Sequence, residues 1–97
     1  MRIEISPAAT VDLDEIWFYG VDQWNVKQAT RYQNKLLDMV QFLADHPELG
    51  KDRSEIKSGY KSYAVGSHIL FFWESDGILR VIRVLHQRMD YMRHLVN

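Results

Sequence analysis

Apolar and polar residues alternate at the start of the chain and then change to a longer period. Residues 2–5 alternate one by one, which predicts a short strand whose two isoleucines face inward. Over residues 7–22 apolar side chains recur every three or four positions, which predicts a helix with one apolar stripe. Ser6 suits the start of this helix, because serine accepts from free backbone N–H groups, and the following proline is tolerated at the first helical position.

A second apolar stripe with the same period predicts a helix that begins after a cap at Asn25 and ends near His46. Gln28, three residues after the cap, completes a variant of the capping box. Pro47 disfavours helix in the residue before it, and Gly50 offers a place to turn. The short connection between the two helices predicts a helical hairpin.

Residues 59–90 change to a strand pattern. Their β-branched and aromatic runs are broken only at Gly66-Ser67 and at residues 75–77, which predicts three strands joined by two tight turns. The charged residues 49–58 have no period and are predicted to form a loop. The expected fold class is α+β, in the order β-α-α-β-β-β with a short C-terminal helix or tail, in a single domain of residues 1–97.

The two turns predict which side chains share a face of the sheet. Two-residue loops at Gly66-Ser67 and Asp76-Gly77 predict the pairs Val65–His68, Tyr63–Leu70 and Lys61–Phe72, then Phe72–Val81, Leu70–Arg83 and His68–Leu85. The face without these residues makes the better core, and we expect the hairpin to pack on it. Its members are Tyr60, Ser62, Ala64, Ile69, Phe71, Trp73, Ile82 and Val84.

The opposite face then keeps large apolar side chains that the hairpin does not cover. They are Tyr63, Leu70, Phe72, Leu79, Val81 and Leu85, with Lys61, His68 and Arg83 among them. A monomer seldom leaves such a patch bare. We expect another protein chain to cover it, and the C-terminal tail or a second copy of this chain is the alternative.

Composition narrows the function classes. The 97 residues contain no cysteine, which excludes disulfides, thiol nucleophiles and Cys-ligated zinc. No segment approaches the ~20 apolar residues of a membrane span. The 46% hydrophobic and 26% charged fractions are typical of a soluble globular protein. We therefore expect a cytoplasmic protein with no membrane association.

The formal net charge of -1 hides an uneven distribution. Residues 1–50 hold four Lys or Arg against eight Asp or Glu, whereas residues 51–97 hold eight against five. The basic half suits an acidic partner, although an ordinary solvated surface with uneven charge is the alternative. The balance does not suggest a bulk polyanion binder, and we expect no direct DNA binding by the chain alone.

Few residues suggest chemistry of their own. The glycines are scattered, which argues against a phosphate cradle. His86, Asp90 and His94 are spaced by four, but two histidines with one carboxylate make an incomplete metal site, so neither a metal nor another cofactor is expected. Arg83, in an apolar strand, is either a contact to a phosphate or acidic partner or half of an ion pair, with Asp90 as a candidate. The three tryptophans are predicted to be core residues.

Several short runs, spread over nearly the whole chain, resemble a known family. The most specific is Ile82-Arg83-Val84-Leu85-His86-Gln87 with Met89-Asp90; others are Asp12-Leu13, Gln28-Ala29, Gly59-Tyr60-Lys61-Ser62 and Gly66-Ser67-His68. Together they resemble the toxins of bacterial ParE/RelE toxin-antitoxin modules, and the ParE branch in particular. The resemblance implies a RelE/ParE-like fold, an antiparallel sheet with a helical hairpin packed on one face.

The resemblance also implies a function. ParE toxins belong to type II modules, inhibit DNA gyrase by binding, stop growth, and are neutralised by a cognate antitoxin. The expected antitoxin is ParD-like, of the ribbon-helix-helix type, and it would occupy the uncovered sheet face. The RelE branch instead cuts mRNA on the ribosome, and an inactive member that only binds its antitoxin is a further alternative.

The candidate site residues differ between these functions. A gyrase inhibitor needs no catalytic residues, and its candidate target contacts are Arg83, His86, Arg88, Arg93 and His94. Ribonucleolytic cleavage needs a base, an acid and a cation for the phosphate, for which the candidates are Lys61, His68, Arg83 and His86. The chain lacks the dense basic run of RelE-type nucleases on the second strand, so gyrase inhibition is the preferred interpretation.

Overall fold

A computed structural model describes residues 1–95 of the chain. Its elements are β1 (Arg2–Ile5), α1 (Pro7–Gln23), α2 (Val26–Asp45), the 3-10 helix η1 (Pro47–Leu49), β2 (Lys51–Asp52), β3 (Lys61–Val65), β4 (His68–Ser75), β5 (Ile78–His86) and α3 (Tyr91–Leu95). The predicted order is confirmed, with two additions: the short 3-10 helix η1 follows α2, and the two-residue strand β2 lies in the stretch predicted to be a loop.

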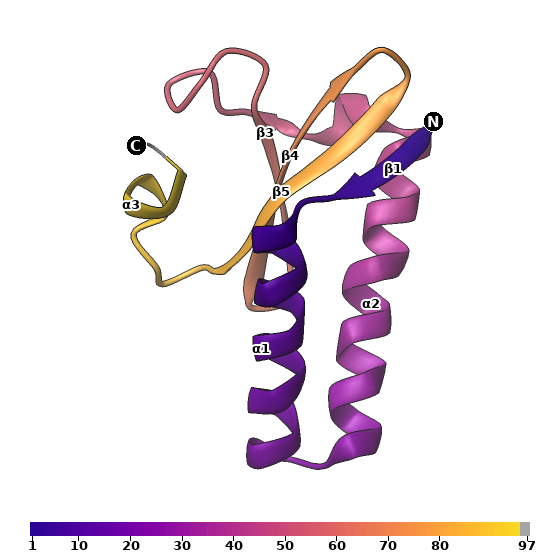
Figure 1. Cartoon of the computed structure of the whole chain (residues 1–97), viewed down its shortest axis with the longest axis vertical. Coiled ribbons are helices and arrows are strands. Elements are labelled where there is room, and N and C mark those ends of the chain that lie inside the picture. The colour runs from indigo at the N-terminus through magenta and orange to yellow at the C-terminus, as the bar shows by residue number, and fades with distance from the viewer. Residues whose placement is uncertain (96–97) are drawn as a thin grey trace.

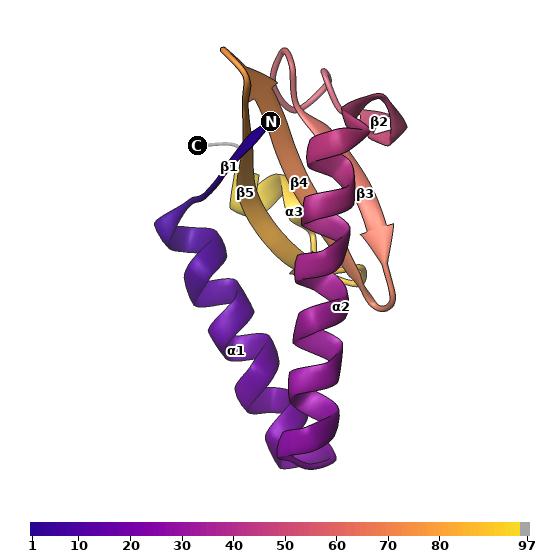
Figure 2. The ribbon, with the colours of Figure 1, turned by 90° about the vertical axis from the view of Figure 1, so that its right-hand side faces the viewer.

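The strands form one sheet in the order β1-β5-β4-β3-β2. β1 pairs with β5 in parallel, and the other neighbours are antiparallel. The helices α2 and α3 lie on opposite sides of this sheet (Figure 1). The hairpin of α1 and α2 extends well past the ends of the strands, so that its turn projects away from the sheet (Figure 2).

Local sequence signals account for the helix starts. The Ser6 hydroxyl accepts from the Ala9 N–H at 3.0 Å, and the Asn25 side chain accepts from the Gln28 N–H at 2.8 Å, as the sequence predicts. Where the two helices approach, a Cβ on Gly20 would lie 3.0 Å from the Cβ of Ala29. A larger residue at position 20 would therefore push the helices apart.

The register of the sheet is predicted correctly for one hairpin and wrongly for part of the other. The pairs between β3 and β4 are as expected. Between β4 and β5, Phe72 pairs with Val81 as predicted, but a bulge leaves Ile82 as an extra residue. Beyond it Leu70 pairs with Val84 and His68 pairs with His86, so the predicted pairs Leu70–Arg83 and His68–Leu85 are wrong.

Groups at the start of α1 hold this bulge. β1 ends at Ile5, so the part of β5 beyond that point has no strand beside it on this edge. Its backbone groups instead form hydrogen bonds with α1 and with the residue that caps α1. The Ser6 hydroxyl donates to the Ile82 carbonyl at 2.7 Å, and the Val84 N–H donates to a carboxylate oxygen of Asp12 at 2.9 Å. Because these partners satisfy the buried backbone groups, the ladder tolerates the extra residue.

The face predicted to be uncovered is the one that the hairpin covers. Its apolar members, apart from Leu85, pack with Leu36, Val40 and Leu43 of α2 in the main core; they are Leu70, Phe72, Leu79 and Val81, each at most 1% exposed, and the partly buried Tyr63. The face assignment was therefore wrong. Both faces are apolar enough to form a core, so the pattern within the strands does not decide between them.

The other face is partly covered by the C-terminal segment. Phe71 and Leu85 are buried there, although both lie outside the main core cluster. Leu85 was predicted on the other face, and the bulge moves it. The ring of Tyr91 in α3 lies 5.3 Å from that of Phe71, and its hydroxyl accepts from Arg53 at 3.2 Å. A short helix held by a few contacts thus covers this face.

Candidate binding groove

A groove of about 570 Å³ lies where the hairpin meets the sheet. We call it the His68 groove; it is lined by Asp12, Glu15, Ile16, Tyr19 and Gly20 of α1, by Trp24, by Ala29 and Tyr32 of α2, and by Ser67, His68, Val84, His86 and Met89. Most of this lining is apolar. Three large side chains at the groove are strongly exposed: Tyr19 at 64%, Trp24 at 61% and Met89 at 47%. Trp24 is therefore not the core residue that its place in the apolar stripe predicts.

The β-bulge brings two histidines together in the groove. His68 begins β4 and His86 ends β5, and the two are direct cross-strand partners. Their ring centroids lie 5.3 Å apart with the planes at 81°. In the register without a bulge, His68 would face Leu85. The sequence indicates both histidines as candidates, and only the bulge pairs them.

Tyr32 holds His68 in one orientation. Its hydroxyl lies 2.6 Å from Nδ1 of His68 and accepts from the Ser67 N–H at 3.0 Å. The same hydroxyl also lies 3.4 Å from the Val65 carbonyl, so Tyr32 joins His68 to both sides of the turn between β3 and β4. Gly66 has a φ of 57°, and a Cβ there would lie 2.8 Å from the Tyr32 oxygen, so this contact requires glycine in the turn.

His68 is uncharged at neutral pH. Burial lowers its pKa to about 4, and the neighbouring charge of His86 acts in the same direction. The carboxylate of Asp12 opposes these two causes but does not outweigh them. A neutral His68 fits its short contact with the Tyr32 hydroxyl. It cannot supply a positive charge to a ligand in the groove near neutral pH.

An ion pair beneath the groove joins α1 to β5. Arg83 donates to both carboxylate oxygens of Asp12, at 2.8 Å from Nε and 2.9 Å from a terminal nitrogen. Asp12 is 7% exposed, and its hydrogen bond raises the pKa of Arg83 further. Another nitrogen of Arg83 lies 3.5 Å from the carbonyl of His94, which ties α3 to the same pair. Arg83 is thus half of a structural ion pair, with Asp12 and not with Asp90.

The residues expected of a nuclease do not all come together. His68 and His86 meet, but Lys61 contacts Glu74 and the Pro47 carbonyl, and Arg83 is engaged by Asp12. Among the described residues that line the groove, none is a lysine or arginine, whereas Asp12 and Glu15 are acidic. The groove therefore offers no cation to a phosphate.

The remaining predicted target contacts lie on the C-terminal segment. Arg88, Arg93 and His94 are exposed, and His86 is partly buried at the groove, where its Nδ1 accepts from the Arg88 N–H at 3.1 Å. Within residues 1–95, no group of three or more His, Cys, Asp or Glu side chains is arranged to hold a metal ion. No helix in that part of the chain is long and apolar enough to cross a membrane.

Of the residues that line the groove, the sequence singles out only His68 and His86 as site candidates. Asp12 lies beside Leu13 in the apolar stripe of the first helix, where an acidic residue indicates a buried partner, and this signal could have found it. Nothing local in the sequence shows that the Tyr32 hydroxyl reaches His68. Met89 follows the last strand, and no local pattern places it at the groove.

Comparison with known proteins gives this groove a context. The family model "ParE toxin of type II toxin-antitoxin system, parDE" matches residues 3–91. A protein named Toxin ParE1 from Mycobacterium tuberculosis (strain CDC 1551 / Oshkosh) is 42% identical over 95 residues, which is 97% of each chain. Another Toxin ParE1, from Caulobacter vibrioides, is 37% identical over 91 residues, which is 94% of each chain.

Two solved structures share the fold. A chain from the chromosomal ParDE toxin-antitoxin system of P. aeruginosa has a TM-score of 0.77 at 17% identity, over 89% of this chain and 95% of that one. A chain from the toxin-antitoxin complex RelBE2 of Mycobacterium tuberculosis has a TM-score of 0.68 at 18% identity, over 89% and 96%. The RelE/ParE-like fold is thereby confirmed. Since the family model spans nearly the whole chain and relatives of this similarity bear the same name, the chain belongs to the ParE toxins of type II toxin-antitoxin systems.

Proposed function

We propose that this toxin inhibits DNA gyrase by binding and that a cognate antitoxin neutralises it. The observation that carries the proposal is the His68 groove, where the candidate acid and base groups meet without a cation. A cleaved phosphodiester gathers negative charge that such a site must stabilise. Arg83 is neutralised by Asp12, and Glu15 in the wall of the groove would repel that charge. Inhibition by binding needs no cation in the groove, and it is the activity that the ParE family leads us to expect.

The state of His68 also argues against RNA cleavage. A general acid must carry a proton to give away near the working pH. With a pKa of about 4, His68 is neutral at neutral pH, and its Nδ1 faces Tyr32. His68 is therefore a poor general acid, and we assign to it the role of shaping one wall of the groove.

We place the antitoxin at the His68 groove instead of on the sheet face predicted from the sequence. The groove is apolar, and its exposed Tyr19, Trp24 and Met89 form a rim of the kind that anchors a partner. Glu15 adds a negative charge at the wall. These features fit an antitoxin segment with apolar side chains and a lysine or arginine. A ParD-like antitoxin of ribbon-helix-helix type remains the expected partner.

We place the gyrase contact on the C-terminal segment. Arg88, Arg93 and His94 are exposed there, and α3, which carries the last two, lies on the side of the sheet opposite to α2 (Figure 1). Exposed cations on one segment suit an acidic protein surface. Arg83 is not part of this contact, because Asp12 engages it.

The direct test is a gyrase supercoiling reaction run in parallel with an mRNA cleavage assay on ribosomes. We expect the purified toxin to block supercoiling, the antitoxin to restore it, and the mRNA to remain intact. Normal supercoiling at excess toxin together with cut mRNA would overturn the proposal. A toxin that affects neither assay but binds the antitoxin would identify an inactive member.

A variant pair locates the gyrase contact. Arg88→Ala combined with Arg93→Ala should weaken gyrase inhibition about tenfold or more, because contacts of exposed charges at a protein interface mainly affect encounter and affinity. Lys51→Ala removes an exposed charge elsewhere and should inhibit like the unmodified toxin. Both proteins should still bind antitoxin, which shows that the fold is intact. Equal inhibition by the two would place the gyrase contact elsewhere.

A further inference from the structure

A second hollow adjoins the His68 groove near the turn of the hairpin. We call it the Arg31 hollow; it has a volume of about 530 Å³ and is lined by Trp24, Asn25, Gln28, Arg31, Tyr32 and Lys35. Trp24 and Tyr32 also line the groove, so the two sites share a border. Trp24 is 61% exposed at this border. A peptide segment that leaves the groove past Trp24 therefore enters the hollow.

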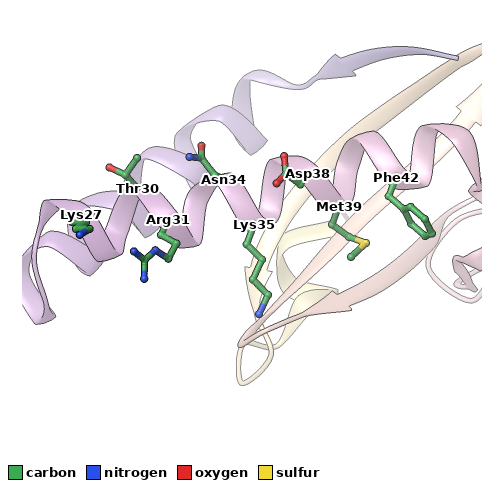
Figure 3. A pocket seen from close by; sticks show the side chains of 8 residues that line it. All are labelled: Lys27, Thr30, Arg31, Asn34, Lys35, Asp38, Met39 and Phe42. Carbon is green, nitrogen blue, oxygen red and sulfur yellow. The ribbon is translucent and has the colours of Figure 1, made fainter.

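The Arg31 hollow is basic. Arg31 and Lys35 are exposed and lie about one turn apart on α2. Figure 3 shows both side chains extending from the same side of the helix, whereas the Asp38 side chain points away from them. Within residues 1–95, neither cation takes part in an ion pair. Both are therefore free to bind an anionic group.

The groove and the hollow differ in charge. Among the described residues, the lining of the hollow includes two cations and no acidic residue, whereas the lining of the groove includes Asp12 and Glu15 and no lysine or arginine. Arg83 neutralises Asp12, which leaves Glu15 as the unpaired charge of the groove. A partner that fills both sites must therefore present a cation to Glu15 and carboxylates to Arg31 and Lys35. A segment bound in the reverse direction would place like charges together, so this polarity fixes its direction.

We propose that the Arg31 hollow binds an acidic stretch of the antitoxin, next to the apolar segment that occupies the His68 groove. This acidic contact extends the proposed antitoxin site and depends on it. Four residues along α2 span about 6 Å, so the carboxylates that meet Arg31 and Lys35 lie about that far apart. Two acidic residues have this spacing when they are four positions apart in a helix or two apart in a strand.

A short acidic peptide suits the hollow better than a nucleic acid does. Proteins that bind nucleic acid neutralise several phosphates, and the hollow offers two cations. The chain around it is acidic, because residues 1–50 hold four Lys or Arg against eight Asp or Glu. A long polyanion would meet this negative charge on either side of the hollow, whereas two carboxylates on a short segment would not.

The affinity of the toxin for the antitoxin of the same module tests the acidic contact. Titration calorimetry with the purified full-length antitoxin should show about tenfold weaker binding for Arg31→Ala combined with Lys35→Ala, because two charge contacts are lost. Added salt should weaken binding of the unmodified toxin more than binding of this variant. Lys51→Ala with Lys57→Ala removes the same charge at exposed positions elsewhere and should bind like the unmodified toxin. Equal affinities for the two double variants would overturn the proposal.

A variant in the groove separates this proposal from the proposed function. Tyr19→Ala removes an exposed aromatic side chain from the groove and should also weaken antitoxin binding. If Tyr19→Ala binds weakly and the Arg31 and Lys35 variant binds normally, the groove assignment stands and the acidic contact is overturned. If the unmodified toxin does not bind the antitoxin at all, the proposed function fails and the acidic contact fails with it.

Chemical cross-linking identifies the occupant of the hollow. A carbodiimide joins a lysine amine to a carboxylate in contact with it, so mass spectrometry of the complex should find Lys35 joined to an antitoxin Asp or Glu. Lys51 is the internal control and should remain uncoupled. A complex in which Lys35 stays uncoupled would overturn the proposal.

Two other occupants give different results with the Arg31→Ala and Lys35→Ala variant. Its circular dichroism and its inhibition of gyrase should match those of the unmodified toxin, which shows that it is folded. A variant that keeps antitoxin binding but loses gyrase inhibition would assign the hollow to gyrase and overturn the proposal. Duplex DNA that binds the unmodified toxin and not the variant would overturn it as well.

Discussion

The two faces of the sheet are covered in different ways. The hairpin face buries Leu70 and Phe72 beneath two long helices, in a core that includes side chains from six of the nine elements. The opposite face buries Phe71 beneath α3, a helix of five residues held by contacts from Arg53 and Arg83. Extensive apolar burial stabilises the first cover, and a few specific contacts stabilise the second.

The two covers therefore differ in how easily they open. A cover that rests on few contacts opens at a lower free-energy cost than the core does. The proposed gyrase contacts Arg93 and His94 lie on that weaker cover, while the proposed antitoxin groove is built on the hairpin side. The comparison predicts that substitutions on the two faces act differently, even where the side chains are equally buried.

Phe71 and Phe72 give the most direct contrast, since they are neighbours in β4 and are 0% and 1% exposed. Phe72→Ala should lower the free energy of unfolding by about 4–5 kcal/mol, because the long helices cannot collapse into the cavity. Phe71→Ala should cost about 3 kcal/mol, because the short α3 can shift to fill the space. Urea denaturation measures both, and equal losses would contradict the comparison.

Asp12→Ala should be the next most costly change. It leaves the Arg83 guanidinium and the buried Val84 N–H without their partner, at about 3 kcal/mol. Asp38 is exposed in the middle of α2, so Asp38→Ala should change stability by less than about 0.5 kcal/mol. Thermal unfolding measures the loss of stability in both variants. A small loss for Asp12→Ala would show that the ion pair does not hold the bulge.

Lowering the pH should destabilise the folded protein on its hairpin side, because His68 becomes protonated. The unfolded chain protonates this histidine near its ordinary pKa of 6.5, whereas the folded chain does so only near 4. Its contribution to stability is therefore complete above pH 6.5 and is lost as the pH falls to about 4, by roughly 2–3 kcal/mol. Denaturation at several pH values between 6.5 and about 4 should show this loss in the free energy of unfolding.

His68→Gln tests the assignment of that loss. The variant cannot titrate at position 68, so this part of the pH dependence should disappear from its unfolding curve. His46→Gln, at an exposed histidine, should keep the full dependence. A dependence that persists in His68→Gln would assign it to another group.

The smallest expected effect concerns α3. Tyr91→Ala removes the contact with Phe71 and the acceptor for Arg53, and should cost about 1–2 kcal/mol. Hydrogen exchange should show faster exchange of the α3 amides with little change in α2. Tyr91→Phe keeps the ring and should have a smaller effect. Equally faster amide exchange in α2 and α3 would contradict the conclusion that α3 is the weaker of the two covers.

Local chemistry made much of the fold predictable. The caps at Ser6 and Asn25 and the two-residue turn at Gly66-Ser67 depend on residues close in sequence, and the structure has them as expected. The candidate site was less predictable. His68 and His86 were singled out, but their pairing needs the bulge after Val81, and Asp12 and Tyr32 act through partners 71 and 36 residues away.

The sequence by itself determined the order of elements, the first β-hairpin and the family, because periodicity, caps, turns and short runs of residues are local properties. Only the tertiary structure decided which sheet face the hairpin covers and where β5 bulges. Both faces are apolar, so the choice depends on how α1 meets β5, where Ser6 and Asp12 satisfy the backbone around Ile82. That long-range contact accompanies the bulge, which shifts β5 beyond Val81 and brings His86 opposite His68 in the groove.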